Sequence, residues 1–410
     1  MKLVRATLTL LAGGALAQAL PLLLGPWITR LYTPTEFGQF SFAWTLATNL
    51  AVVGCARFEF ALPLEREEAG AALLVALCTR VLAGMTVVAC AVGGVLLLVQ
   101  KLAPAALLPL AVLTGAAAQA LTLWATRAEA FRALALARIV QWGGAAVLQV
   151  VAGLLALGAV GLMLGPVLAC FVAALMLARP APQGGWRASL RSSPGQGAAL
   201  AAMARKYRDF PLFNTPNAFA SALQDSLAMI LLTSWAGAAS AGYWALALRY
   251  LKAPASLVGG ALSQTLYPKL VAAADFAAAR QLVRHAMLVL SALAAALMLV
   301  LLTIGPWLFE RVFGHQWQLA GELARALAPY IALHFIASPL AVVTMAWEGQ
   351  AWALKLAVVG QVLFVAALAA GLRWGGLTGA AWAVSGIMAL YFGYYFLALA
   401  TWKPSKPHTP

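Results

Sequence analysis

The chain has 410 residues, of which 63% are hydrophobic and only 10% are charged. A soluble domain has roughly 45–50% apolar and about 25% charged residues, so this composition excludes the soluble classes and indicates a protein of the lipid bilayer. The formal net charge is +15. Because the basic residues occupy gaps between apolar runs, where they would face anionic lipid headgroups, we expect no nucleic-acid partner.

Long apolar runs follow one another along the whole chain. A helix of about 20 apolar residues crosses the hydrocarbon core, because its backbone N–H and C=O groups bond to each other where there is no water. We therefore predict an all-α polytopic membrane protein with about twelve transmembrane helices. The predicted spans are residues 7–29, 37–56, 71–99, 104–126, 138–157, 159–178, 212–235, 240–267, 285–309, 320–346, 352–372 and 377–400.

The Lys and Arg residues gather in alternate gaps between these spans. If the N-terminus is cytoplasmic, 19 of the 27 basic residues fall in inside segments. The outside loops hold Arg30, Lys101, Arg311 and Arg373, and the spans hold Arg80, Arg249, Lys252 and Arg325. The positive-inside rule then predicts that both termini face the cytoplasm.

The longest polar interval divides the spans into six and six. Its Pro, Gly, Ser and Arg residues are typical of a flexible cytoplasmic segment. We predict an N-terminal six-helix lobe over residues 1–178, a cytoplasmic basic linker over 179–209, a C-terminal six-helix lobe over 210–402 and a cytoplasmic tail over 403–410.

The two halves also share a sequence pattern. Val53-Gly54-Cys55-Ala56, followed by Pro63, matches Val258-Gly259-Gly260-Ala261, followed by Pro268, at an offset of 205 residues. Just upstream, residues 37–40 match residues 241–244 at an offset of 204. These matches favour a parallel repeat of a six-helix unit, with a central cavity at the interface of the repeats as the substrate path.

Polar residues recur at helical spacing in the span over 212–235. Asn214, Asn217, Ser221, Gln224 and Asp225 share one face of an otherwise apolar helix, and we expect that face to line the cavity rather than to meet lipid. Asp225 is the acidic residue predicted deepest within a span, which makes it the candidate to bind a coupling ion, H⁺ or Na⁺.

Two cations lie one helical turn apart in the span over 240–267, Arg249 and Lys252. An ionised group in the bilayer costs a few kcal/mol and usually faces protein or water, so both are candidates for the cavity wall. The alternative is that Asp225 pairs with one of them and joins the two spans. Arg57 and Glu59 follow the span over 37–56, where a solvated loop and a binding role are both open.

The cysteines and the glycine-rich segments of the sequence do not indicate a metal site or an ATP site. Cys55, Cys78, Cys90 and Cys170 lie in or beside apolar spans without metal-like spacing, so we expect small buried hydrophobic residues, no disulfide and no metal. The sequence has no Gly-x-x-x-x-Gly-Lys-Ser/Thr loop for ATP phosphates. We therefore expect no cofactor and no ATPase activity.

Several stretches resemble one family. They are Leu11–Pro26, Thr29–Pro34, Glu36–Gly38, Arg57–Glu59, Ala61–Pro63, the acidic run Glu65–Glu68, Tyr207–Pro211, Thr215–Pro216, Ala241–Pro268 and Phe313–Gly321. The chain resembles the bacterial polysaccharide flippases of the O-antigen (Wzx-like) type, in the multidrug/oligosaccharidyl-lipid/polysaccharide exporter superfamily. The acidic run, at the start of a predicted span, is typical of a charged helix N-terminus.

The resemblance implies two six-helix lobes around a central cavity in the bacterial inner membrane. It also implies export of an undecaprenyl-diphosphate-linked oligosaccharide, with the polymerase and ligase of the same pathway as further partners. A cation-lined cavity would receive the diphosphate. Arg30, Arg57 and Arg249 fall on stretches that resemble the family, whereas Lys252 and Asp225 do not fall where the family has a fixed charge.

Two other functions are compatible with the sequence. An ion-coupled multidrug or small-molecule antiporter of the same superfamily would share the spans, but it would suit a carboxylate-rich cavity, and this chain is richer in Arg and Lys. A membrane polysaccharide polymerase or ligase would be an enzyme with a long outside loop, and the predicted outside gaps are short. We therefore expect a transporter and no catalytic residues.

Overall fold

The computed structural model describes residues 2–178, 196–273 and 275–402, without the side chains of residues 2–12, 196, 217, 221 and 261. The tail over 403–410 and the first part of the predicted linker lie outside these residues. The described chain is helical throughout and contains no strand, so the predicted all-α class is confirmed.

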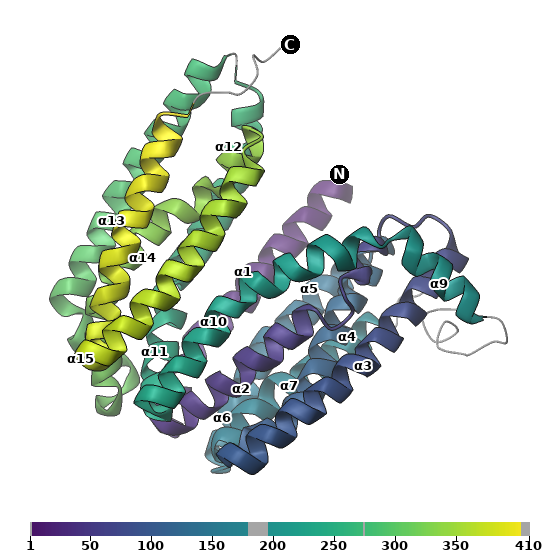
Figure 1. The fold of residues 1–410 in the computed structure, drawn as a ribbon, viewed down its shortest axis with the longest axis horizontal. Coiled ribbons are helices and arrows are strands. Elements are labelled where there is room, and N and C mark those ends of the chain that lie inside the picture. Colours follow the sequence, from purple (N-terminus) through teal and green to yellow (C-terminus); the bar gives the residue numbers. More distant parts are fainter. Residues whose placement is uncertain (1, 179–195, 274, 403–410) are drawn as a thin grey trace. The chain divides into compact units, whose positions relative to one another are not determined.

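The chain divides into two compact units, Met1–Ile230 and Leu231–Pro410 (Figure 1). The helices of the first unit are α1 (Lys2–Leu31), α2 (Pro34–Val52), η1 (Phe58–Ala61), α3 (Glu68–Gln100), η2 (Ala103–Leu107), α4 (Leu108–Arg127), α5 (Phe131–Ile139), η3 (Val140–Gly144), α6 (Ala145–Leu154), α7 (Gly158–Leu177), α9 (Gln196–Lys206), η4 (Phe210–Asn214) and most of α10 (Thr215–Ala236). The second unit has α11 (Ala238–Leu251), α12 (Ala253–Val271), α13 (Phe276–Phe313), η5 (His315–Trp317), α14 (Gln318–Ala346) and α15 (Gln350–Ala400). The lobe boundaries given from the sequence stay a prediction.

Each predicted span has a helical counterpart. Within the described residues, 7 helices are long and apolar enough to cross a membrane, and α15 contains two of the predicted spans. The chain is therefore a multi-pass membrane protein. The other predicted spans correspond to α1, α2, α10 and the pair α11–α12. Because their apolar runs include polar residues, among them Gln18 and Asn49, we predict that these four spans form the cavity wall. The count of twelve and the two-lobe layout stay predictions.

Two of the predicted spans differ from the helices observed. The span over 240–267 is broken at Lys252, because Pro254 lacks an N–H and would clash with the carbonyl four residues earlier in a continuous helix. The span predicted over 138–157 occupies Phe131–Leu154 instead. Because Arg138 is charged, the sequence indicated that this span starts at residue 138 and not earlier. The Arg138 side chain is exposed and can reach outward from the helix, so it does not prevent the earlier start.

The start of α2 follows from its sequence. Thr33 is the N-cap, its hydroxyl accepts from the Glu36 N–H, and the Glu36 carboxylate accepts from the Thr33 N–H at 2.8 Å. This reciprocal capping box satisfies two N–H groups that lack helical partners, and Pro34 adds a φ suited to the first turn. The preceding Tyr32 hydroxyl donates to the Gln149 carbonyl of α6 at 2.7 Å. The α1–α2 connection is thereby fixed to the rest of the first unit.

The close contacts between helices occur at small residues. In a bilayer the hydrophobic effect does not drive helices together, because lipid tails are as apolar as the side chains. Helix packing therefore depends on how closely two backbones approach. A Cβ added at Gly54 would lie 2.6 Å from the Ala116 Cβ of α4, and one at Gly259 would lie 2.8 Å from the Ser338 Oγ of α14. Gly54 and Gly259 are the equivalent glycines of the predicted repeat.

The pairing of helices within each unit agrees with that equivalence. In the first unit α4 packs on α2, α3 and α7, and in the second unit α14 packs on α12, α13 and α15. In each unit the fourth predicted span thus packs on the second and the third. This supports the predicted parallel repeat without placing one unit against the other.

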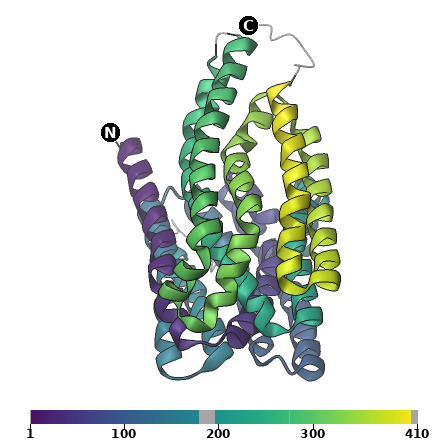
Figure 2. The same cartoon turned by 90° about the vertical axis from the view of Figure 1, so that its left-hand side faces the viewer.

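The two halves of α15 lie side by side, as the yellow-green and yellow ribbons in Figures 1 and 2 show. Gly376 has φ 62° and ψ −156°, a conformation essentially restricted to glycine. A Cβ on Gly371 would lie 2.4 Å from the Ala380 Cα, although nine residues of straight helix would separate them by about 13 Å. The predicted spans over 352–372 and 377–400 therefore form a helical hairpin.

Gly371→Ala and Gly386→Ala should have opposite effects on stability. The first methyl group collides with the backbone at Ala380, and overpacking of this kind costs roughly 1–3 kcal/mol. The second meets open space within the same helix, where replacing Gly with Ala gains up to about 1 kcal/mol. Thermal unfolding of the purified protein in detergent measures both, and equal midpoints for the two variants would contradict this hairpin.

Candidate functional site

The cations predicted for the cavity lie at different levels of the first unit. Arg30 is exposed in the last turn of α1, and Arg57 is half-buried after the end of α2. The 19 residues of α2 between them rise by about 28 Å, close to the hydrocarbon thickness of roughly 30 Å. The structure therefore separates Arg30 and Arg57 rather than bringing them to one site.

The turn after α2 has an unusual backbone. Ala56 and Arg57 have φ 49° and 62°, in the left-handed region that non-glycine residues adopt at a cost of about 1–2 kcal/mol each. The Arg57 guanidinium lies over the Phe60 ring at 4.9 Å. The turn ends in η1, which directs the Glu59 side chain into the unit.

Glu59 is a buried carboxylate with 2% of its surface exposed. Gln119 of α4 donates to its Oε1 at 3.1 Å, while its Oε2 is buried with no hydrogen-bond partner among the described residues. Burial raises the pKa of this carboxyl, and its own backbone and the charge of Arg57 oppose the shift only in part. Of the two open interpretations for Glu59, the structure disfavours the solvated loop charge.

Two thiols lie beside Glu59. Cys55 precedes it in the turn and Cys78 is on α3, and their sulfur atoms and a Glu59 carboxylate oxygen all lie within 4.8 Å of one another. Both thiols are buried, as expected for small apolar residues. Within the described residues, these three side chains form the arrangement that could hold a metal ion, which the spacing along the chain did not reveal.

A second carboxylate, Glu65, joins the turn before α3 to the end of α9, within the first unit. Lys206 Nζ and the Tyr207 hydroxyl donate to the same oxygen, Glu65 Oε2, at 2.6 and 2.9 Å. The Glu65 side chain is only 7% exposed, whereas that of Lys206 is 55% exposed. We call Glu65, Lys206 and Tyr207 the Glu65 cluster. The hydrogen bonds from Lys206 and then Tyr207 lower the pKa of Glu65.

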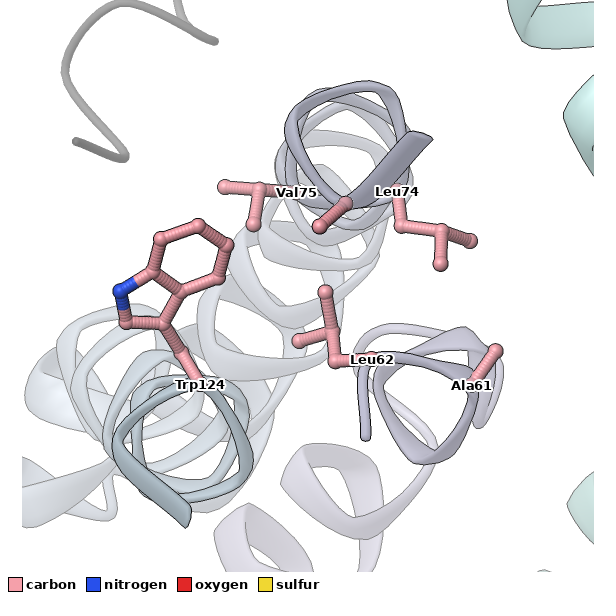
Figure 3. Close-up of a cluster of buried hydrophobic side chains, with 6 residues drawn as sticks. Ala61, Leu62, Leu74, Val75 and Trp124 are labelled. Carbon is pink, nitrogen blue, oxygen red and sulfur yellow. The ribbon is translucent and has the colours of Figure 1, made fainter. Parts of the chain in front are cut away.

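Apolar contacts and a second ion pair surround the Glu65 cluster. Leu62, Leu74, Val75 and Trp124 converge from η1, α3 and α4 (Figure 3), and Met203, Tyr207 and Phe210 pack against them. Arg127, at the end of α4, pairs with Glu68 at 2.9 Å and donates to the Glu65 carbonyl. As predicted, the acidic run begins a helix: Glu67 is the N-cap of α3 and Glu68 lies in its first turn, although Glu67 makes no side-chain cap bond. The acidic run also holds neighbouring elements together.

The polar face predicted on α10 is partly exposed. Asn214 and Asp225 are exposed and Gln224 is half-buried, while the side chain of Asn217 lies outside the described residues. The next residue, Ser226, is buried and accepts from Asn49 Nδ2 of α2 at 2.8 Å. This interhelical bond between two of the predicted cavity-wall helices contributes about 0.6–1.7 kcal/mol.

In the second unit, Arg249 and Lys252 lie at the break between α11 and α12. Both side chains are half-buried, one helical turn apart as the spacing predicts. Lys252 lies within electrostatic range of His334 on α14. Next to the break, Tyr250 packs on Phe313 with ring centroids 4.4 Å apart. The two cations therefore lie at the point where the predicted span over 240–267 is interrupted.

The predicted site residues thus form separate groups. Arg57 and Glu59 share one turn, the polar residues of α10 share one helix, and Arg249 and Lys252 share one break. Whether these groups line one cavity stays a prediction. The sequence reasoning missed Gln119, Glu65 and Ser226, and the one usable signal was the resemblance around Glu65–Glu68 and Tyr207.

Comparison with known families decides the assignment of the chain. Residues 27–321 match the sequence profile of the family described as "polysaccharide biosynthesis protein". The chain belongs to the polysaccharide biosynthesis protein family. The resemblance to polysaccharide flippases is thereby confirmed at the level of family. No curated protein matches the sequence.

Solved structures share the fold across nearly the whole chain. A structure described as "Lipid II flippase MurJ, inward closed conformation" matches at 10% identity and TM-score 0.66, covering 97% of this chain and 90% of that one. An inward-facing multidrug resistance MATE family transporter of the MOP superfamily matches at 16% identity and TM-score 0.54, covering 93% of both chains.

A further match is a MOP superfamily transporter from Pyrococcus furiosus. It is 15% identical, with TM-score 0.52, and covers 97% of this chain and 94% of that one. At these identities the likenesses establish the fold alone. The family member described here therefore has the MOP transporter fold.

Glu65→Gln should loosen the packing of α9 against α3 and the turn before it, because it removes the charge that Lys206 and Tyr207 share. We expect several-fold faster hydrogen–deuterium exchange over residues 196–206 of the full-length protein, after correction for intrinsic rates. Glu67→Gln, at an exposed position in the same acidic run, is the matched control and should leave exchange unchanged.

The same contact predicts a pH dependence. A carboxyl whose pKa is lowered on folding stabilises the fold above its unfolded pKa, and that stabilisation is lost as the pH falls through the folded value. Protection of α9 should therefore be constant from pH 5 to 8 and fall below about pH 4.3 in the wild type only. Equal protection of wild type and Glu65→Gln at pH 7 would contradict the role of the Glu65 cluster.

Proposed function

We propose that this protein is a flippase that moves undecaprenyl-diphosphate-linked oligosaccharide repeat units across the bacterial inner membrane for O-antigen or exopolysaccharide biosynthesis. The family match over residues 27–321 carries the proposal. The fold supports it, because MurJ, a protein described as a lipid II flippase, shares that fold over nearly the whole chain.

The charges of the chain fit such a substrate. A diphosphate on a lipid needs cations within the membrane, and Arg offers it two parallel N–H donors. Arg249 and Lys252 lie where α11 ends and α12 begins. At such a break within the membrane, side chains and backbone groups can both face a polar ligand. Arg30 and Arg57, at opposite ends of α2, would meet the headgroup as it arrives and leaves.

The polar residues of α10 are the natural contacts for the sugars. Asn214, Asn217 and Gln224 carry amides, which donate and accept hydrogen bonds and so suit hydroxyl groups. Asn214 is exposed and Gln224 is half-buried, and a hydrated cavity between the repeats would give both a polar neighbour. Alternating exposure of that cavity by rocking of the two halves then moves the headgroup.

A multidrug antiporter is the second candidate, favoured by the likeness to a multidrug resistance MATE family transporter. A cationic drug would select a carboxylate-rich cavity, whereas the cavity candidates here include Arg30, Arg57, Arg249 and Lys252. Drug resistance conferred by expression of the protein would support the antiporter. We do not propose an enzyme; the polymerase and ligase of the pathway would act on the exported product.

Deletion of the gene tests the proposed function. Lipid-linked repeat units should accumulate on the cytoplasmic side of the membrane, and surface polysaccharide should disappear, with both restored by the wild-type gene. Normal surface polysaccharide in the deletion strain would contradict the flippase assignment.

We predict that both termini face the cytoplasm, since the inside segments hold 19 of the 27 basic residues. A green fluorescent reporter fused after Pro410 should fluoresce, and alkaline phosphatase fused there should be inactive. Active phosphatase on a full-length fusion would overturn the topology.

Arg249→Ala should lower export by roughly ten- to a hundredfold, the equivalent of a charged hydrogen bond of about 1.5–3 kcal/mol. Arg249→Lys should recover part of it, because the charge remains while the two-pronged geometry is lost. Arg373→Ala, at an exposed predicted outside loop, is the matched control. Surface polysaccharide at matched expression measures all three, and normal export by Arg249→Ala would remove this residue from the site.

Asp225→Asn should uncouple export from an ion gradient while substrate binding is retained. The reason is that a carboxylate at membrane depth can bind H⁺ or Na⁺, and an amide cannot be ionised. Inverted membrane vesicles with an imposed gradient measure transport, and Glu322→Gln, which neutralises an exposed carboxylate outside the proposed site, is the control. Gradient-driven transport by Asp225→Asn at the wild-type rate would exclude Asp225 as the coupling residue.

A further inference from the structure

A buried cluster of two thiols and a carboxylate lies within the first unit, apart from the residues proposed to contact sugars. Cys55, Glu59 and Cys78 are 2%, 2% and 3% exposed. One potential ligand atom from each lies within 4.8 Å of the other two. Cys55 and Glu59 come from the turn after α2, and Cys78 comes from α3.

The carboxylate of this cluster lacks one partner. Gln119 occupies Glu59 Oε1, but Oε2 is buried without a hydrogen bond among the described residues. A buried polar atom left unpaired costs about 1–3 kcal/mol, and more when it is charged. A cation held between Oε2 and the two sulfur atoms would remove that cost.

The ligand set selects the kind of cation. Thiolate ligands favour soft or borderline ions such as Zn²⁺, and a carboxylate is an accepted third ligand. In a tetrahedral zinc site two sulfur atoms at 2.3 Å from the ion are about 3.8 Å apart. The observed separations need to close by no more than about 1 Å, which rotation of two cysteine side chains supplies.

The surroundings resemble those of built metal sites. Ligands of metal ions are usually oriented by a second residue that hydrogen-bonds to them, and the Gln119 amide does this for Glu59. The left-handed residues Ala56 and Arg57 lie between Cys55 and Glu59 and turn both toward Cys78. The Arg57 charge acts on Glu59 and would offset the net −1 of Zn²⁺ with two thiolates and one carboxylate.

We propose that Cys55, Glu59 and Cys78 bind one thiophilic divalent cation, with Zn²⁺ as the representative ion. Bound there, the ion would join the turn after α2 to α3 and, through Gln119, to α4. Three protein ligands leave a fourth position for water or another ligand. The ion would therefore hold the end of α2, one of the predicted cavity-wall helices, in a fixed position.

The test uses the full-length protein, purified in detergent, reduced with a phosphine and freed of metal by a chelator. Titration with Cd²⁺ should give the ultraviolet absorption of a cadmium–thiolate bond, saturating at one ion per chain. Zn²⁺ should compete for the site and raise the thermal unfolding midpoint. Neither readout depends on transport.

Variants locate the site. Cys55→Ala and Cys78→Ala should abolish the absorption, and Glu59→Gln, which keeps both thiols and the side-chain volume, should weaken Cd²⁺ binding tenfold or more. Cys170→Ala is the matched control, because this thiol on α7 is similarly buried. It shows how much loss of a buried thiol outside the proposed site changes the unfolding midpoint and Cd²⁺ binding.

The unfolding midpoint without metal shows whether each variant is folded. If a cysteine variant does not fold, the decision rests on Glu59→Gln and on the Zn²⁺-dependent stabilisation of the wild type. Binding by Glu59→Gln as tight as in the wild type, loss of binding in Cys170→Ala, or no Zn²⁺ stabilisation of the wild type would each overturn the proposal.

Discussion

Each backbone amide inside the bilayer needs a hydrogen-bond partner from the protein itself, and the structure depends on that requirement. It makes the described chain helical throughout and limits irregular backbone to a few places. Three of those places are the turn at Ala56 and Arg57, the break at Lys252 and the reversal at Gly376. Two of the three carry cations, so charge and broken helix coincide.

Much of the fold could be predicted because lipid imposes a simple pattern. Every predicted apolar run of about 20 residues corresponds to helix, and the positions of Lys and Arg suggested an orientation. The predicted helix bounds were wrong where a single residue has more influence on the helix than the average hydropathy of the segment. Pro254 breaks a run that is apolar on both sides, and Arg138 lies inside a helix that its charge argued against. Hydropathy averaged over a window does not register either effect.

The candidate site was less predictable, since it depends on contacts between distant segments. Spacing along one helix correctly placed Arg249 beside Lys252. It gave no sign that Glu65 would meet Lys206, or that Glu59 would meet Gln119 and Cys78, because these pairs come from different helices. Two buried carboxylates close together in the chain thus differ in their partners, since Glu65 binds an exposed lysine and Glu59 lies beside two thiols.

The central claim is that this chain moves a lipid-linked oligosaccharide between leaflets, and reconstitution measures that directly. Purified protein in liposomes, supplied with an undecaprenyl-diphosphate-linked repeat unit labelled on its sugar, should expose inner-leaflet label to a membrane-impermeant glycosidase added outside. Protein-free liposomes should protect about half of the label. Protection that stays at that level with folded wild-type protein, with and without an ion gradient, would contradict the account.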